Sequence, residues 1–343
     1  MDRKKLLSAK YLVPAGLCLL VIFEMLYHYL FAAMSVNGKE AKIYIDSDDS
    51  LDSVICKLRP VCTSGGISGF STLALQLGYN ENVRPGMYLL DENIGPLSFL
   101  RKLRNGRQDF IMLTVPSVRT MPDLARKLGD KMLTDSATFM QAFSDSMKIR
   151  KYGFTTETLR AMFLPHTYEV LWTDSADKFM NRMEKEYKKF WTDERKSKAK
   201  IKGLSLIEVS TLASIVDSET NIESDKPRVA GVYLNRLHEG MKLQADPTVK
   251  FAVGDFSIKR ILFKHLSTKS PYNTYRYEGL PPGPICIPSI SGIDAVLNAE
   301  NHDYLFFCAS PAFDGTHIFA RDDKEHMENA RKYQAALNAR KIK

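Results

Sequence analysis

The sequence predicts an α+β fold behind a single N-terminal membrane-spanning helix. The N-terminus is basic and is followed by a largely apolar run over residues 11–34. Short segments such as Ala41–Ile45 and Phe110–Val115 have the alternating or apolar composition of strands. Residues 204–216 instead carry apolar side chains at spacings of three, four and five, which predicts a helix. Strands and helices are therefore both expected after the apolar run.

The apolar run is predicted to be an uncleaved membrane anchor. Residues 11–34 number 24, which is enough to span a bilayer. The uninterrupted core, residues 11–23, has the length of a signal-peptide core, and Glu24 and His28 interrupt the rest, so a cleaved signal is the alternative. In either case the basic residues 1–10 stay in the cytoplasm as a short tail and the remainder of the chain is exported.

Composition and motifs argue against several classes of function. The chain has 343 residues, enough for about two domains. Its net charge of +8 favours attraction to an acidic polymer or lipid, but no nucleic-acid-binding motif or phosphate-binding glycine loop is present. The seven histidines are scattered and no His/Cys cluster has metal-ligand spacing, so we expect no metal site. No cofactor is expected. The absence of a Gly-x-Ser-x-Gly motif excludes a serine hydrolase of that type.

The cysteines fit an exported protein that does not depend on disulfides. Cys56 and Cys62 are six residues apart and could close a small loop in an oxidising compartment, or remain as two buried thiols. Cys286 and Cys308 lie in apolar surroundings and are predicted to belong to the core.

The first predicted module covers residues 40–115. It contains strands, short helices and a glycine-rich loop, expected in this order: strand Ala41–Ile45, helix Leu51–Leu58, loop 62–69, a strand after Pro85 and Gly86, helix 97–105 and strand Phe110–Val115.

The second predicted domain covers residues 116–343. Its expected elements are helices 121–127, Ser136–Ser144 and 176–191, an aromatic-rich strand at 163–172, a helix that ends at Glu219, a helix 227–239 capped by Asp225, a polar turn 244–248, a buried strand 304–308 that pairs with His317–Ala320, and a charged helix 324–338.

The most informative residue is Glu219. It falls four residues after Ile215 and seven after Leu212, and therefore on the apolar face of its helix, whereas Asp217 points to the opposite side. A carboxylate on an apolar face is costly unless it is paired or protonated, and its raised pKa suits a general acid near neutral pH. The alternative is a helix-end residue that is solvated or paired with Arg228 or Arg236.

Several short segments resemble the endolytic murein transglycosylase (YceG-like) family. They occur in the family's order at residues 163–168, 213–220, 232–237, 240–249, 272–275 and 279–285, with Pro288 after them. Two positions depart from the family pattern. His166 stands where Asp is usual, and Asp217 replaces the first acid of the usual Glu-x-Glu, while the second acid is retained as Glu219.

The resemblance implies an architecture and a location. It implies a cytoplasmic tail at 1–10, an anchor at 11–34, a LysM-like α+β module at 40–115 and a mixed α/β catalytic domain at 116–343. The protein would sit in the bacterial inner membrane with a single span, its N-terminus cytoplasmic and its catalytic domain periplasmic. Peptidoglycan glycan strands are the implied substrate, and glycan-polymerising cell-wall synthases are a partner class suggested by family behaviour.

The resemblance also implies a mechanism with Glu219 as the catalytic residue and no cofactor. Glu219 would protonate the glycosidic oxygen between MurNAc and GlcNAc and then accept the proton of the MurNAc C6 hydroxyl. The product would be a 1,6-anhydro-MurNAc end within a strand, and action on nascent strands would terminate their elongation. The intramolecular attack benefits from proximity, and one group serves as acid and then as base.

Six further residues are candidates for substrate binding: Gln244, Asp246, Tyr272, Asn273, Tyr275 and Asn235. The alternative for the first two is a stabilised turn, and for the tyrosine segment an aromatic patch in the core. Two other functions stay open. A muramidase-type hydrolase would add Asp246 or Glu169 as a second carboxylate, and a non-catalytic murein-binding scaffold would not need Glu219.

Overall fold

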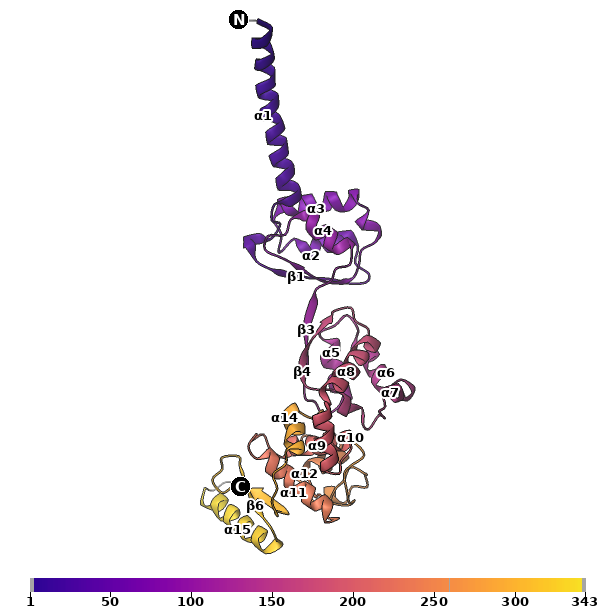
Figure 1. Ribbon diagram of the computed structural model, residues 1–343, viewed down its shortest axis with the longest axis vertical. Helices are drawn as coiled ribbons and strands as arrows, with labels where there is room; N and C mark the ends of the chain where they lie inside the picture. Colours follow the sequence, from indigo (N-terminus) through magenta and orange to yellow (C-terminus); the bar gives the residue numbers. More distant parts are fainter. Residues whose placement is uncertain (1–2, 259, 341–343) are drawn as a thin grey trace. The chain divides into compact units, whose positions relative to one another are not determined.

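The computed structural model describes residues 3–258 and 260–340 (Figure 1). The chain forms two compact units, one of Met1–Met112 with Glu169–Asp174 and the other of Leu113–Tyr168 with Ser175–Lys343. Both contain helices and strands, which confirms the α+β prediction. The LysM-like identity and the predicted domain limits stay predictions. Residues 1 and 2 of the predicted tail, and residues 259 and 341–343 of the predicted catalytic domain, lie outside the described residues.

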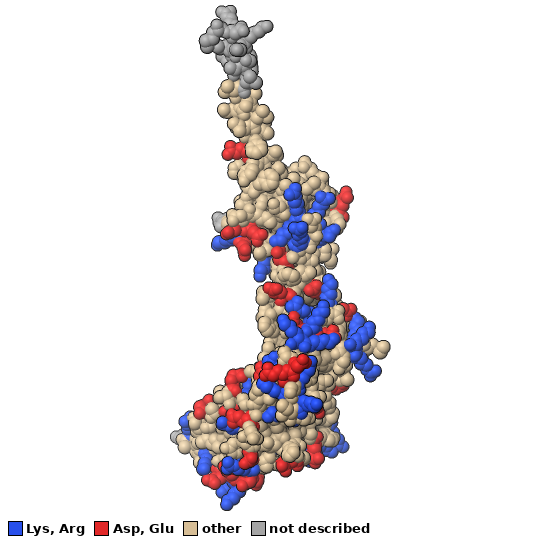
Figure 2. Space-filling view, viewed as in Figure 1, with Lys and Arg blue, Asp and Glu red and all other residues tan. Residues whose placement is uncertain are grey.

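Helix α1 (Arg3–Phe31) supplies the expected apolar N-terminal helix. Its stretch Val13–Phe31 is long and apolar enough to cross a membrane. Figure 2 shows this part of α1 as a mostly uncharged surface. The helix already begins at Arg3, inside the predicted tail, and passes through Pro14 without ending.

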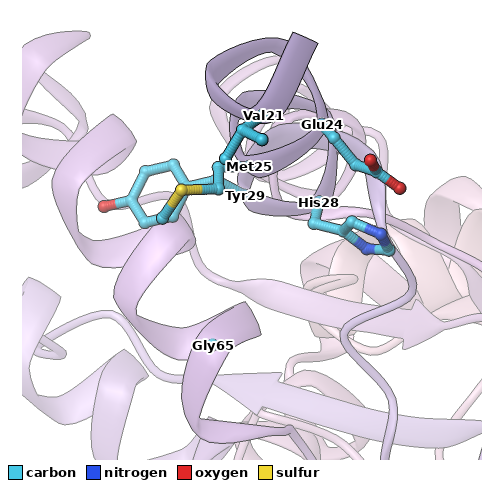
Figure 3. A pocket seen from close by; sticks show the side chains of 6 residues that line it. All are labelled: Val21, Glu24, Met25, His28, Tyr29 and Gly65. Carbon is cyan, nitrogen blue, oxygen red and sulfur yellow. The ribbon is translucent and has the colours of Figure 1, made fainter. Parts of the chain in front are cut away.

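The last turns of α1 pack onto helix α3 (Ser64–Gln76). The hydroxyl of Tyr29 donates to the Ser68 carbonyl oxygen at 3.0 Å and is 2.6 Å from Thr72 Oγ1. A side chain at Gly69 would clash with the Tyr29 carbonyl oxygen, so glycine permits this close approach. Figure 3 shows Tyr29 on one side of α1 and His28 on the other. The span is therefore continuous with the folded part of its unit.

The rest of this unit is a small sheet covered by helices. Strand β1 (Ala41–Ile45) pairs antiparallel with β2 (Gly86–Leu90), with Ile43 opposite Tyr88. Helices α2 (Leu51–Leu58), α3 and α4 (Pro96–Arg104) enclose a core that includes Val54, Phe70 and Phe99. The short 3-10 helices of the unit are η1 (Val36–Gly38) and η2 (Tyr79–Glu81).

Two predictions in this unit are corrected by the structure. The predicted loop 62–69 is wrong from Ser64 onward, because α3 begins there with Thr63 as its N-cap. Burial of Phe70 and neighbouring apolar residues outweighs the poor helix propensity of the glycines. The disulfide alternative is not realised, since Cys56 and Cys62 are free; Cys56 is exposed and only Cys62 is buried.

The remaining elements are mainly helical. They are β3 (Phe110–Val115), α5 (Met121–Gly129), α6 (Ser136–Ser144), α7 (Ser146–Lys151), η3 (Leu159–Met162), β4 (His166–Leu171), α8 (Ala176–Phe190), α9 (Asp193–Ile201), α10 (Leu206–Glu219), α11 (Lys226–His238), α12 (Asp246–Val253), α13 (Phe263–Leu266), α14 (Ile290–Leu297), β5 (Phe306–Ala309), β6 (His317–Ala320) and α15 (Asp323–Ala339). Strand β3 pairs with β4, and β5 pairs antiparallel with β6, as predicted for the latter pair.

Helix α10 forms the centre of the larger unit. Its residues 209–216 are all buried, and it packs against α11 and α14. A capping box starts the helix: Ser205 Oγ accepts from the Glu208 amide at 3.2 Å, and Glu208 Oε2 accepts from the Ser205 amide at 2.7 Å. Glu208 is thus a cap, although periodicity places it on the same face as Glu219.

Three further predictions in the larger unit need correction. The polar turn 244–248 is wrong in its second half, because Asp246 begins α12 with Pro247 in its first turn. Asp225 makes no side-chain cap on α11, since its carboxylate accepts from the His317 amide at 2.9 Å. Strand β5 is half-buried rather than buried, and Cys308 with it, whereas Cys286 belongs to the core as predicted.

Candidate functional site

Glu219 is the last residue of α10 and faces a pocket of about 480 Å³. The pocket is built from five elements and their loops, all within the larger unit. Its lining residues are Glu219, Tyr233, Arg236, Leu243, Gln244, Asp246, Tyr275, Phe306, Phe307, Asp323, His326 and Met327. The carboxyl group is therefore placed at an open, mixed polar and aromatic surface of the size that a small part of a polymer could enter.

Tyr233 is the direct partner of Glu219. Its hydroxyl donates to Glu219 Oε1 at 2.8 Å, and the residue itself is only 2% exposed. Its ring lies edge-on to Phe307 at 5.8 Å, which fixes its direction. Burial raises the pKa of Tyr233 well above its ordinary value, so the phenol stays protonated and remains a donor.

Burial raises the pKa of Glu219 to about 7. The hydrogen bond from Tyr233 lowers it, the negative charge of Asp246 raises it, and the positive charge of Lys250 lowers it. Near neutral pH the carboxyl group is thus poised between its acid and base forms, although Glu219 keeps partial access to solvent. The sequence prediction of a raised pKa is confirmed.

The two arginines considered as partners of Glu219 are engaged elsewhere. Arg228 pairs with Glu300 at 2.8 Å. Arg236 donates to the carbonyl oxygens of Leu305 at 2.6 Å and Leu243 at 2.9 Å. No ion pair between Glu219 and a cation occurs within the described residues. The carboxyl group is therefore not paired with either arginine.

Asp246 is the second carboxylate of the pocket. The Tyr275 hydroxyl donates to Asp246 Oδ1 at 2.7 Å, and burial raises the pKa of Tyr275. The Ala245 amide donates to Thr274 Oγ1 at 3.0 Å, which ties the start of α12 to the segment before Tyr275. Asp246 and Tyr275, two of the residues that the sequence marks as substrate-binding candidates, therefore line the same pocket as Glu219.

Gln244 also lines the pocket and has an unusual backbone. Its φ of 51° lies in the left-handed region, which costs a non-glycine residue roughly 1 kcal/mol. Its amide donates to the Thr274 carbonyl at 3.1 Å, and Arg236 Nη1 lies 3.4 Å from its Oε1. Gln244 is exposed at the pocket wall.

The other three substrate-binding candidates do not line this pocket. Asn273 is fully buried and donates to the carbonyls of Leu266 and Thr268, each at 2.9 Å. Tyr272 packs on Phe251 with ring centroids 4.7 Å apart. Asn235 donates to the carbonyl oxygens of residues 302 and 304 at 2.7 and 2.9 Å. The two asparagines hold neighbouring backbone segments through these bonds, and substrate binding by the three residues stays a prediction.

Asp217 lies two residues before Glu219 in very different surroundings. It accepts from Lys226 Nζ at 2.9 Å and from the amide and hydroxyl of Ser289 at 2.7 and 2.8 Å. A Cβ at Gly292 would lie 2.5 Å from its carboxylate oxygens, so glycine permits α14 to approach. Burial alone would lower the pKa of Lys226, but its bonds to Glu223 and Asp217 raise it. Asp217 therefore joins α10 to α11 and α14.

Sequence reasoning missed one whole wall of the pocket. That wall contains Phe306 and Phe307 of β5 and Asp323, His326 and Met327 of α15. The ring of His326 stacks on Phe306 at 5.3 Å. Tyr233 was missed as well, although it lies inside one of the family-like segments. Only the packing of α11 on α10 and of α15 on β5 brings these residues to Glu219.

Glu169, the alternative second acid, lies on β4 in the smaller unit, whereas the pocket around Glu219 is built entirely from the larger one. Among the described residues, no group of three or more His, Cys, Asp and Glu is arranged to hold a metal ion.

The chain is similar to known proteins in sequence and in structure. An endolytic murein transglycosylase of Bacillus subtilis (strain 168) is 29% identical over 269 residues, which cover 74% of each chain. One of Streptococcus pneumoniae (serotype 2, strain D39) is 26% identical over 294 residues, which cover 76% of this chain but 52% of the relative. A crystal structure of a yceG-like protein from Listeria monocytogenes matches with a TM-score of 0.55 and 25% identity, over 84% of this chain and 98% of that one.

The sequence profile of the YceG-like family matches residues 43–332 of the chain. This range holds Glu219, Asp246, Tyr275 and almost all of both compact units beyond α1. The resemblance inferred from short segments is thereby confirmed, and the chain belongs to the YceG-like family.

Proposed function

We propose that the chain is a membrane-anchored peptidoglycan lytic transglycosylase in which Glu219 acts as acid and then as base. The observation that carries the proposal is the raised pKa of Glu219, about 7, at the wall of an open pocket. A general acid works best when its pKa lies near the working pH. The names of the similar proteins, which are endolytic murein transglycosylases, support the choice of substrate.

In the first step the protonated Glu219 donates its proton to the glycosidic oxygen between MurNAc and GlcNAc, and the bond from that oxygen to MurNAc C1 breaks. In the second step the MurNAc C6 oxygen attacks C1 and its hydroxyl proton passes to the Glu219 carboxylate. The products are a 1,6-anhydro-MurNAc end and a new GlcNAc hydroxyl, and Glu219 is protonated again. No water is consumed, so one carboxyl group is sufficient.

The other pocket residues have supporting roles in this mechanism. Asp246 is close enough for its charge to raise the pKa of Glu219, and the same charge would stabilise positive charge that develops at C1. Tyr275 holds Asp246 through its hydroxyl. The aromatic rings of Phe306 and Phe307 offer apolar faces to a sugar ring, and Gln244 offers an exposed amide.

Helix α1 is the proposed anchor, and it would hold the catalytic unit outside the cytoplasmic membrane of a bacterium. Cleavage within nascent strands would then terminate their elongation close to the membrane. Glycan-polymerising synthases are the corresponding partner class, because they release the strands that such an enzyme would cut. The LysM-like character of the smaller unit belongs to the same proposal.

A muramidase-type hydrolase is the second candidate, because Asp246 places a further carboxylate in the pocket of Glu219. In that reaction Asp246 would act as nucleophile or base and water would be consumed. The two reactions give different ends, since a hydrolase leaves a reducing MurNAc.

The test is mass spectrometry of the products formed from purified murein by the full chain in detergent, alongside Glu219→Gln. Glu239→Gln is the matched control, because Glu239 is exposed and does not line the pocket. We expect anhydro-MurNAc ends from the wild type and the control, and a rate lower by about 10²–10⁴-fold for Glu219→Gln. Reducing MurNAc ends would identify the hydrolase. Binding to murein without cleavage would identify a scaffold.

A further inference from the structure

A second pocket, of about 560 Å³, lies at the same end of α10 as the catalytic pocket. Asp217, Ser218 and Asn221 line it, whereas Glu219 lines the other one. Nothing in the mechanism proposed above uses this second pocket. All of its lining residues belong to the larger unit, so it is a feature of one folded body.

Two segments of the chain contribute residues to both pockets. The C-terminal turn of α10 contributes to both, as described. Helix α12 begins with Asp246 in the catalytic pocket, and Phe256, three residues after its last residue, lines the second pocket. The eight residues of α12 rise about 12 Å. The second pocket therefore lies beside the same two chain segments as the catalytic pocket.

Two cationic side chains of the second pocket, Arg119 and Lys127, form no ion pair among the described residues. The guanidinium of Arg119 lies 5.2 Å from the centre of the Phe256 ring, which keeps it over an apolar face. Lys127 is exposed in the last turn of α5.

The two carboxylates of this pocket already have partners. Asp217 accepts from Lys226 at 2.9 Å, and Asp123 accepts from the Thr120 hydroxyl at 2.6 Å and from Arg126 at 3.3 Å. Among the described residues, neither carboxylate forms an ion pair with Arg119 or Lys127. The pocket is therefore suited to an anionic group with an apolar part, since a guanidinium binds a carboxylate through two parallel hydrogen bonds.

We propose that this pocket binds a carboxylate of the stem peptide carried by the murein strand. The inference rests on the proposed function and specifies its substrate as peptide-bearing glycan. Stem peptides are attached to the lactyl group of MurNAc, the sugar whose bond would be cut. They carry carboxylates for Arg119 and Lys127 and short apolar side chains for Phe256. Recognition of the peptide would place the adjoining MurNAc at Glu219.

The first test compares cleavage of peptide-bearing glycan with cleavage of glycan stripped of its peptides by an amidase. The full chain in detergent is used as wild type, as Arg119→Ala/Lys127→Ala, and as Lys131→Ala. Lys131 is the matched control, because it is an exposed cation just after α5 that does not line the pocket. We expect the double variant to lose about tenfold in kcat/KM on peptide-bearing glycan, through KM, and to match wild type on stripped glycan. An equal loss on both substrates, or no loss on either, would overturn the proposal.

The second test does not depend on cleavage. Calorimetry would measure binding of a soluble stem tetrapeptide to the wild-type full chain, with the amide-blocked peptide as comparison. The acid form is expected to bind at least tenfold more tightly, and the double variant is expected to lose that difference. If inorganic phosphate displaces the peptide at equal concentration, the pocket is a general anion site and the proposal is wrong. Peptide binding by a protein that makes no anhydro ends would retain this site while rejecting the proposed reaction.

Discussion

The last turn of α10 places two carboxylates in contrasting surroundings. Asp217 has a lysine at 2.9 Å and two hydrogen bonds from Ser289. Glu219 has a single tyrosine donor, no cation in an ion pair among the described residues, and a pKa of about 7. The Asp217 side chain is 11% exposed, and Glu219 is half-buried.

This difference separates structural from chemical roles. A buried carboxylate that is paired and fully hydrogen-bonded stays charged and ties elements together. A buried carboxylate without a cation holds its proton more tightly and can release it to a substrate near neutral pH. The paired Asp217 carboxylate should therefore stabilise the fold. The unpaired Glu219 carboxylate should destabilise the fold, and the same surroundings make it reactive near neutral pH.

The largest expected effect on stability comes from removing the ion pair between Lys226 and Asp217. Lys226→Met leaves the Asp217 carboxylate buried without its cation, and we expect a loss of about 3 kcal/mol and a melting temperature lower by roughly 10 °C. The side chain of Lys226 is 6% exposed. The control is Lys332→Met, which removes an exposed pair with Glu328 that contributes less than about 1 kcal/mol. Equal melting shifts in the two variants would contradict the structural role of Asp217.

The second prediction concerns the pH dependence of stability on the Glu219 side. The pKa of Glu219 in the folded protein, about 7, lies above its ordinary value of 4.5. The folded state therefore binds this proton more tightly, and stability from this group is present at low pH and is lost as pH rises from about 4.5 to 7. Glu219→Gln removes that loss and should stabilise the protein at pH 8 by up to about 3 kcal/mol.

Thermal melting of wild type and Glu219→Gln at pH 8 and at pH 4.5 measures this effect. The variant should melt higher than wild type at pH 8, and the two should converge at the lower pH. Glu239→Gln, an exposed position, should show no such difference. A Glu219→Gln variant that melts below wild type at pH 8 would show that the charged carboxylate stabilises the fold, against the comparison drawn above.

The smallest effects are expected from the neighbours of Glu219, and they have opposite signs. The charge of Asp246 raises the pKa of Glu219, so Asp246→Asn should lower it. The Tyr233 hydrogen bond lowers this pKa, so Tyr233→Phe should raise it. Each shift is expected to be about one pH unit.

The pH dependence of kcat/KM measures these shifts in the pKa of Glu219. Activity of a general acid falls as pH rises through its pKa, so this fall should move to lower pH in Asp246→Asn and to higher pH in Tyr233→Phe. Shifts in the same direction would contradict the assignment. A loss of activity by Asp246→Asn at every pH, of the same size as in Glu219→Gln, would instead favour the hydrolase with Asp246 as its second acid.

Local patterns predicted much of this arrangement. The spacing of Leu212 and Ile215 placed Glu219 on the apolar face of its helix and Asp217 on another, and the two residues do line different pockets. Strand pairing of β5 with β6 was also anticipated. These features depend on residues close in sequence, whose relative directions follow from the geometry of one helix or hairpin.

Predictions failed where distant residues decide. Glycines at 65, 66 and 69 favour a loop, but α3 forms because its apolar residues are buried in the unit's core. Asp225 has the composition of an N-cap, yet it bonds to His317. In each case a partner elsewhere in the unit competes with the local role.

The sequence by itself therefore determined the apolar N-terminal helix, the mixed helix and strand content, the family and the presence of a carboxylate on the apolar face of α10. Only the tertiary structure decided that Lys226 pairs with Asp217, that Tyr233 donates to Glu219, and that β5 and α15 close the pocket. The physical reason is that desolvation and charge pairing act through space. A pKa near 7 depends on which side chains surround a carboxyl group, and chain folding brings them there from distant positions.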